Sequence, residues 1–230
     1  MSTLHKTLIF TVCCGLLVAG YLLPMAFAQA PSPQVIFTWQ AHNFYPSNYS
    51  GKAAATINTS IVISATVIRN NRFVDTSKAN FIWYIDGRFF SRGSGLSEIV
   101  LKINKLRGDE YFVRMSIDLD GERIEGSFTV PVSGQRTVIE MPSPNNIVFR
   151  KRQIVFHAVP YFFNVVSFDN FEFFWSIDNQ NQPKQRSNRL VLDIGDSPYL
   201  SGEEVLISNI TSNSLNSIET TRSNVRLTIR

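Results

Sequence analysis

One seven-residue stretch occurs twice in the chain and constrains the fold more than any other feature. The first copy is Phe81-Ile82-Trp83-Tyr84-Ile85-Asp86-Gly87, and the second is Phe173-Phe174-Trp175-Ser176-Ile177-Asp178-Asn179. In each copy, large apolar residues occupy every second position, which is the period of a β-strand with one buried face. The Asp-Gly or Asp-Asn pair that follows tolerates positive φ and is typical of a hairpin turn. The two stretches therefore predict two strands, each with a core tryptophan (Trp83 and Trp175) and a tight turn at its end.

Three further segments of alternating apolar residues recur in the same order around the two tryptophans. The matched sets are Ile61, Ile63 and Ala65 with Ile154, Phe156 and Ala158; Ile99, Leu101 and Ile103 with Leu190, Leu192 and Ile194; and Phe128, Val130 and Val132 with Val225, Leu227 and Ile229. A repeated order of this kind indicates two copies of one structural unit. Short strands separated by frequent turn residues are typical of a β-sandwich. The sequence therefore predicts an all-β protein with two tandem sandwich domains, residues 34–133 and 137–230.

Residues 1–28 have the pattern of a secretory signal peptide. Lys6 is their only charged residue, an apolar run covers residues 8–23, and Ala26-Phe27-Ala28 forms a small-x-small cleavage site. We expect cleavage before Gln29, with an uncleaved membrane anchor as the alternative. Either outcome predicts export to the cell surface, the periplasm or the extracellular space, with no other contact with a membrane.

The only two cysteines, Cys13 and Cys14, lie inside this leader. The two domains therefore have no disulfide. Exported domains without disulfides are more typical of a bacterial envelope than of a eukaryotic secreted protein.

A tryptophan on the third strand of a seven-strand sandwich resembles the immunoglobulin pattern. The form Phe-x-Trp-x-Ile-Asp-Gly at residues 81–87 resembles the bacterial Ig-like and PKD-type repeats of exported surface proteins. Short motifs at residues 37–41, 45–46 and 49–52 are similar to exported Ig-like proteins of small-genome bacteria, some of them linked with type IV pilus machinery. The resemblance implies two immunoglobulin-like domains and an envelope or pilus protein as partner.

Residues for catalysis and metal binding are scarce. After the leader, the chain has no cysteine, only His42 and His157 as histidines, no Gly-x-Ser-x-Gly elbow and no phosphate-binding loop. Asp118-Leu119-Asp120-Gly121-Glu122 has the oxygen ligands that calcium prefers, but Asp-Gly is also a hairpin turn, which we favour. We expect no catalytic, cofactor or metal site.

The formal charge of +4 is spread along the chain. Arg150-Lys151-Arg152 is the only basic run, whereas nucleic-acid-binding proteins usually cluster their basic residues on one face. We therefore expect no nucleic-acid partner.

Aromatic residues are the feature that can carry function, since the chain has 18 phenylalanines and 7 tyrosines. Some of them fall on the outward phase of the tryptophan strands, where a solvent-facing sheet is usually polar. Others crowd a segment that the fold makes a loop. These side chains either pack beneath the loop or between the domains, or they form a contact surface. The candidate partner-binding residues are Tyr84, Phe174, Tyr161, Phe162, Phe163 and Phe168.

These observations favour a non-enzymatic, exported envelope protein that acts as a structural or protein-binding adaptor. The alternative is a carbohydrate-binding or adhesive surface module, in which exposed aromatic rings stack on sugars. A platform of Trp and Tyr beside Asp or Asn would favour the sugar, and a broader Phe and Val surface would favour a protein. A hydrolase would need a cleft with two convergent acids, which the spacing does not predict.

Overall fold

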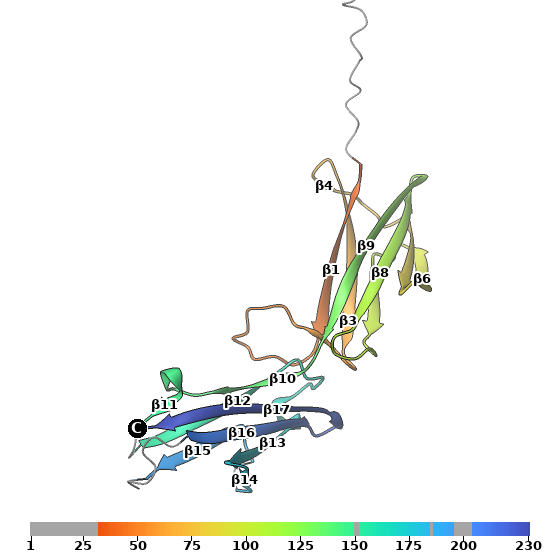
Figure 1. Ribbon diagram of the computed structural model, residues 1–230. Coiled ribbons are helices and arrows are strands. Elements are labelled where there is room, and N and C mark those ends of the chain that lie inside the picture. The colour runs from red at the N-terminus through yellow and green to blue at the C-terminus, as the bar shows by residue number, and fades with distance from the viewer. Residues whose placement is uncertain (1–31, 150–151, 185, 196–203) are drawn as a thin grey trace, which may run out of the picture. The chain divides into compact units, whose positions relative to one another are not determined.

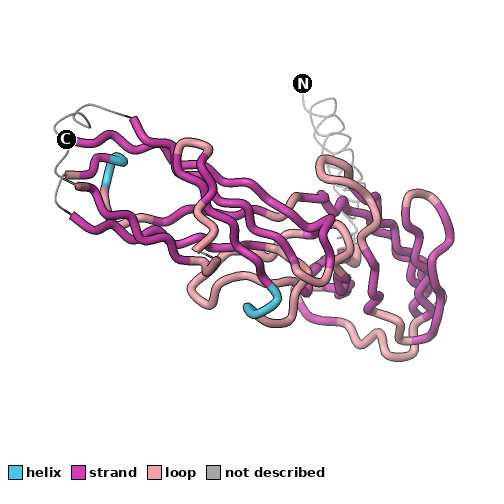
Figure 2. Tube along the Cα trace, turned by 90° about the horizontal axis from the view of Figure 1, so that it is seen from below, coloured by secondary structure: helices cyan, strands magenta, loops and turns pink. Residues whose placement is uncertain are grey.

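The computed structural model describes residues 32–149, 152–184, 186–195 and 204–230, and its regular structure is almost entirely β (Figures 1 and 2). The predicted leader, with its cleavage site and cysteines, lies outside the described residues. From Pro33 to Arg230 the chain belongs to one compact unit. None of the helices in the described part of the chain is long and apolar enough to cross a membrane.

The first sandwich consists of two antiparallel sheets, with one parallel pair at the margin of the second. One sheet has the order β1-β3-β4, with β7 also paired with β3, and the second has the order β2-β9-β8-β5-β6. Strands β2 and β9 form the parallel pair. The strands are β1 (Gln34–His42), β2 (Ala55–Thr56), β3 (Ser60–Arg69), β4 (Arg72–Phe73), β5 (Asn80–Ile85), β6 (Arg88–Ser94), β7 (Glu98–Lys102), β8 (Glu110–Leu119) and β9 (Glu122–Ser133).

The second sandwich repeats this arrangement. Its sheets have the orders β10-β12-β15 and β11-β17-β16-β13-β14, with β11 and β17 parallel. Its elements are β10 (Arg136–Glu140), η1 (Pro144–Asn146), β11 (Ile147–Val148), β12 (Arg152–Tyr161), η2 (Phe168–Asn170), β13 (Phe171–Ile177), β14 (Gln180–Asn181), β15 (Arg189–Ile194), β16 (Glu204–Asn213) and β17 (Asn216–Ile229).

The two sandwiches therefore have one topology, in which β5 corresponds to β13, β8 to β16 and β9 to β17. In both, the tryptophan strand lies in the sheet that also contains the last two long strands, as in immunoglobulin-like sandwiches. The predicted all-β, tandem immunoglobulin-like fold is confirmed. The domain boundaries at residues 34–133 and 137–230 stay a prediction.

The predicted turns also have the expected backbone geometry. Asp86 and Gly87 have φ values of 51° and 76°, and Asp178 and Asn179 have 48° and 66°. Two successive residues with positive φ form the tight hairpin turn that matches the twist of the flanking strands. The sequence selects Asp, Asn and Gly there because these residues tolerate that conformation.

Each sandwich encloses its own hydrophobic core. The first is built from the inward phases of strands β3, β5, β7, β8 and β9, and the second from those of β12, β13, β15, β16 and β17. The inward residues of β8, Val113, Met115 and Ile117, are all fully buried. Burial of one face of each strand is the main favourable contribution to folding of a sandwich without disulfides.

Residues 91–95 include two serines and two glycines, yet most of this segment is a strand. Residues 91–94 belong to β6, which pairs with β5, and the register between the two shifts after Trp83. The extra residue of this bulge allows the glycine-containing sequence to remain in the sheet.

Candidate functional site

The two tryptophans have the same environment in the two sandwiches. Trp83 is completely buried and Trp175 is 2% exposed. The indole Nε1 of Trp83 donates a hydrogen bond to the carbonyl oxygen of Leu96 at 2.9 Å, and that of Trp175 donates to Ser187 at 2.8 Å. Each indole therefore fills the core and fixes the segment that leads to the next strand, and neither ring is accessible to a ligand.

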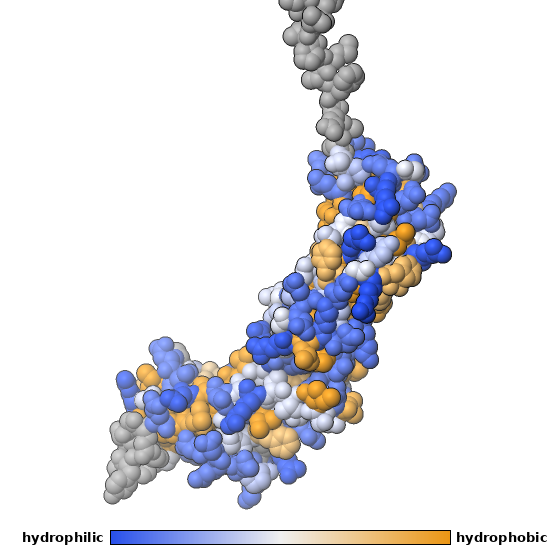
Figure 3. All heavy atoms as spheres, turned by 45° about the vertical axis from the view of Figure 1, so that its right-hand side comes forward, coloured by the Kyte–Doolittle hydropathy of each residue, from blue (hydrophilic) through white to orange (hydrophobic). Residues whose placement is uncertain are grey.

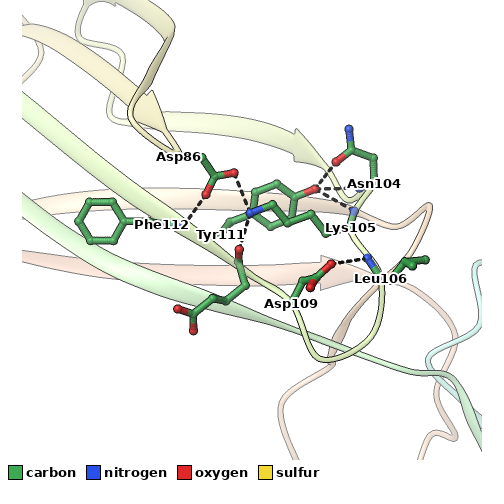
Figure 4. A network of polar contacts seen from close by, with 8 residues as sticks. Asp86, Asn104, Lys105, Leu106, Asp109, Tyr111 and Phe112 are labelled. Carbon is green, nitrogen blue, oxygen red and sulfur yellow. Dashed lines mark hydrogen bonds and ion pairs between the residues drawn. The ribbon is translucent and has the colours of Figure 1, made fainter.

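The aspartate after each tryptophan strand joins its turn to the neighbouring strand. The backbone N–H of Asp86 donates to the carbonyl oxygen of Phe112 at 2.8 Å, and its carboxylate accepts the N–H of Phe112 at 3.0 Å (Figure 4). The ammonium group of Lys105 also lies 2.8 Å from the Asp86 carboxylate. Burial raises the pKa of Asp86, but the hydrogen bonds from Lys105 and Phe112 outweigh it and hold the pKa below its ordinary value.

A tyrosine anchors the bend before β8 in the same region of the first sandwich. The hydroxyl of Tyr111 accepts hydrogen bonds from the backbone N–H groups of Asn104 and Lys105, at 2.9 and 3.1 Å (Figure 4). This is the tyrosine corner of immunoglobulin-like sandwiches. Val205 occupies the corresponding position at the start of β16, so the second sandwich has no such hydroxyl there.

The aromatic loop expected to contact a partner is only partly accessible, which corrects the prediction for two residues. Phe163 is fully buried and Phe162 is 5% exposed. Phe163 packs in the second core, and its carbonyl oxygen accepts the N–H of Phe44 at 2.7 Å. The Tyr49 ring contacts Phe162 with centroids 5.5 Å apart. The segment that contains Phe44 and Tyr49 thus covers both side chains. This agrees with the alternative in which these rings pack inward.

A buried carboxylate fixes the end of this loop. Glu219 is 1% exposed, and its carboxylate accepts the backbone N–H of Asn164 at 2.8 Å and the amide of Asn213 at 3.3 Å. Hydrogen-bond donors of this kind compensate for the cost of burying a carboxylate. The segment that contains Phe162 and Phe163 is therefore held in place.

The other two aromatic residues of this region are more accessible. Tyr161 is partly buried, and the guanidinium of Arg136 lies 5.0 Å from its ring centroid. Phe168 is 41% exposed, and its other side packs against Phe173 at a centroid distance of 5.7 Å. These two residues therefore stay partly accessible at the surface.

The outer face of the first tryptophan sheet has the clearest group of exposed aromatic residues in the described part of the chain. Tyr84 lies opposite Phe89 on one side and Arg114 on the other. Its ring centroid is 6.4 Å from that of Phe89 and 4.4 Å from the Arg114 guanidinium carbon. Phe112, two residues before Arg114 on β8, points to the same face. Phe89 is 60% exposed and Phe112 is 47% exposed. We call these four residues, Tyr84, Phe89, Phe112 and Arg114, the aromatic face.

Sequence reasoning identified only Tyr84 in this group. The Asp86-Gly87 turn sets the pairing of β5 with β6, and that pairing places Phe89 opposite Tyr84. Phe112 is the outward residue between the buried Tyr111 and Val113. Both signals were present in the sequence, but using them requires the register of three strands at once.

Phe174 lies on the outer face of the second tryptophan sheet and is 46% exposed. It lines a pocket of about 360 Å³. The pocket lining consists of Phe173, Phe174, Trp175, Asn181, Gln182, Pro183, Arg186 and Ile210. Among the described residues of this lining, Arg186 is the only charged one, so an anionic group would complement it.

The remaining polar candidates are dispersed. Asp118 and Asp120 are exposed in the hairpin between β8 and β9, where Asp120 and Gly121 have φ values of 54° and 81°. His42 and His157 are exposed on separate strands. In the residues that the structure describes, no group of three or more His, Cys, Asp or Glu side chains could hold a metal ion.

Figure 3 shows hydrophobic side chains scattered among hydrophilic ones on the visible face of the described residues. Exposed apolar residues of this kind indicate a contact site only where several of them lie next to one another. The aromatic face and the Phe174 pocket are two places where the contacts bring such residues together.

The comparisons with known proteins show similarity at the level of the fold. No protein-family model matches the chain, and no curated protein matches it. Solved structures that it resembles include the fibronectin(III)-like modules of Clostridium thermocellum CbhA, with 16% identity, 86% of this chain and 94% of that chain covered, and a TM-score of 0.33. Another is the three N-terminal domains of the Highly Immunogenic Outer Capsid protein of bacteriophage RB49, with 8% identity, 86% and 59% coverage, and a TM-score of 0.47.

A third is SGBP-B of the Bacteroides ovatus mixed-linkage glucan utilization locus, in complex with mixed-linkage heptasaccharide. It has 11% identity, 87% and 48% coverage, and a TM-score of 0.26. The similar structures are immunoglobulin-like and fibronectin-like sandwich modules, and the likeness extends to the fold alone.

Proposed function

We propose that this chain is a non-enzymatic, exported protein of the cell envelope that binds another envelope or pilus protein through the aromatic face of its first sandwich. The observation that carries the proposal is the pair of exposed rings Phe89 and Phe112 beside Arg114 and the partly buried Tyr84. Exposed aromatic residues with an adjacent arginine are the residue types that dominate binding energy at protein interfaces.

The carbohydrate-binding alternative receives less support from the surface. A sugar platform of tryptophan is absent from the described residues, because Trp83 and Trp175 are buried and Trp39 is partly buried beneath the Lys52 ammonium, 3.5 Å from its ring centroid. The exposed rings at the aromatic face are mainly phenylalanines, which favour a protein surface.

The proposal is tested by site-specific photo-crosslinking in cells that produce the protein. A photoreactive phenylalanine analogue is placed at Phe89, at Phe112, or at the control position Val100. Val100 is 61% exposed, on a strand of the other sheet.

We expect positions 89 and 112 to give adducts with the same protein, and position 100 to give none. The adducts should be lost when Arg114 is changed to Ser. Equal adducts at all three positions, or adducts with glycan only, would contradict the proposal.

A further inference from the structure

The two copies of the fold differ most sharply at the outer edge of the tryptophan strand. In the first sandwich, β6 pairs with β5 along its whole length, from Asn80 to Ile85. In the second, β14 has two residues and pairs only with Ser176 and Ile177. The strand that covers this edge in one copy is therefore almost missing in the other.

Alternate residues of β13 direct their backbone N–H and C=O groups toward this edge. The carbonyl oxygen of Trp175 accepts the N–H of Gln182 at 2.8 Å, which shows that the backbone N–H and C=O groups of Trp175 face this edge of the sheet. In an antiparallel ladder, residues two positions apart point their N–H and C=O groups to the same side. Phe173 therefore points its groups to the same edge, and no described residue forms a backbone hydrogen bond with it there.

The Phe174 pocket adjoins this open edge. Its lining combines residues of β13 with Ile210 of β16 and with Gln182, Pro183 and Arg186 of the segment after β14. A strand added beside β13 would present alternate side chains to the apolar wall formed by Phe174 and Ile210. A carboxylate on the same strand would lie near Arg186.

We propose that the second sandwich binds an extended peptide segment of a partner protein by strand addition to β13. The segment occupies the place that β6 occupies in the first sandwich, antiparallel to β13, with an apolar side chain against Phe174 and an acidic side chain near Arg186. Backbone hydrogen bonds supply affinity in this mode and the side-chain pocket supplies specificity. The inference rests on the proposed binding function, but it concerns a different sandwich and a different surface.

The test is a selection of short random peptides on the full chain, followed by titration of the selected synthetic peptides. We expect sequences that alternate apolar with acidic or polar residues, and affinity that falls about tenfold or more in Phe174→Ser. Val100→Ser, at an exposed position on β7 outside both proposed surfaces, is the matched control and should leave the affinity unchanged. Methylation of the peptide backbone nitrogens should abolish binding at alternate residues only, because one set of amides faces β13.

A selection that yields no peptide sensitive to Phe174→Ser would overturn the inference, as would equal effects of methylation at every residue. Oligosaccharide binding that requires Phe174, without peptide binding, would overturn it in favour of a glycan site. The two proposals fail separately, because adducts at position 112 in the Phe174→Ser variant report on the aromatic face alone.

Discussion

The carboxylate of Asp178 accepts a hydrogen bond of 2.7 Å from the backbone N–H of Leu206. Asp86 makes the same bond to Phe112 in the first sandwich, and in both copies the aspartate N–H donates back to the same residue. The aspartate thus extends the ladder between the tryptophan strand and its neighbour by one further pair. This explains why the repeated sequence motif includes an aspartate as well as a turn glycine or asparagine.

The depressed pKa of Asp86 predicts a pH dependence of stability. A carboxylate whose pKa is lower in the folded than in the unfolded state stabilises the fold above its unfolded pKa, near 3.9, and this contribution is lost as the pH falls through the folded pKa. As the pH is lowered below about 4, we expect Asp86→Asn to lose less stability than the parent.

The measurement is the denaturant midpoint as a function of pH. Asp118→Asn, which removes an exposed carboxylate of the same sheet, is the control. Identical acid profiles for the parent and Asp86→Asn would contradict the assignment.

Truncation of the core tryptophan should be severe. Trp83→Ala removes a completely buried side chain and leaves a cavity, so we expect a loss of about 3 to 5 kcal/mol from the free energy of unfolding. Phe89→Ala, at an exposed position, should change it by no more than about 0.5 kcal/mol. Denaturant unfolding followed by circular dichroism distinguishes the two. A Trp83→Ala protein as stable as the parent, but with lost binding, would show that the indole is a ligand platform.

The tyrosine corner gives a prediction for a single hydroxyl. Tyr111→Phe leaves the ring in place and removes the acceptor for the N–H groups of Asn104 and Lys105. We expect a loss of about 1 to 2 kcal/mol. Tyr84→Phe is the control, since its hydroxyl forms no hydrogen bond with the described residues. Equal stability of the two variants would show that the corner contributes nothing.

The second core contains a polar pair where the first is apolar. Asn209 and Thr211 lie opposite Trp175 and Phe173, in the places that Met115 and Ile117 occupy in the first sandwich. Both polar residues are fully buried. Thr211 donates to the Asn209 amide oxygen at 2.6 Å, but the amide nitrogen has no partner among the described residues.

An unpaired buried donor costs about 1 to 3 kcal/mol. We therefore expect the double change Asn209→Met with Thr211→Val to stabilise the second sandwich by about 1 to 2 kcal/mol. Asn209→Met alone should gain less, because it leaves the Thr211 hydroxyl without its acceptor. Thermal unfolding measures both variants. Destabilisation by the double change would show that the polar pair is needed for packing.

This polar pair also explains which part of the fold could be predicted from the sequence. Strand β8 was recognisable because Val113, Met115 and Ile117 alternate in an apolar set. Its counterpart β16 has Asn209 and Thr211 in the same phase, so the period-two signal is interrupted and the strand was not identified. Hydrophobic periodicity predicts a strand only where its buried face is apolar.

The candidate site was less predictable than the fold. The burial of Phe162 and Phe163 depends on Phe44 and Tyr49, which precede them by more than a hundred residues in the chain. The aromatic face depends on the register of β5, β6 and β8. Local sequence carries neither kind of long-range information, whereas it does determine the turns at Asp86 and Asp178.

Hydrogen exchange of two equivalent backbone amides tests the central claim, that the chain contains two copies of one sandwich and that the second has an open edge. Phe81 pairs with Gly93 of β6, whereas Phe173 has no described partner at the same place. We expect the Phe81 amide to be protected and the Phe173 amide to exchange at least about a hundredfold faster, as measured by NMR on the full chain. Equal and strong protection of both amides would contradict the account, because it would show that the edge of β13 is already occupied.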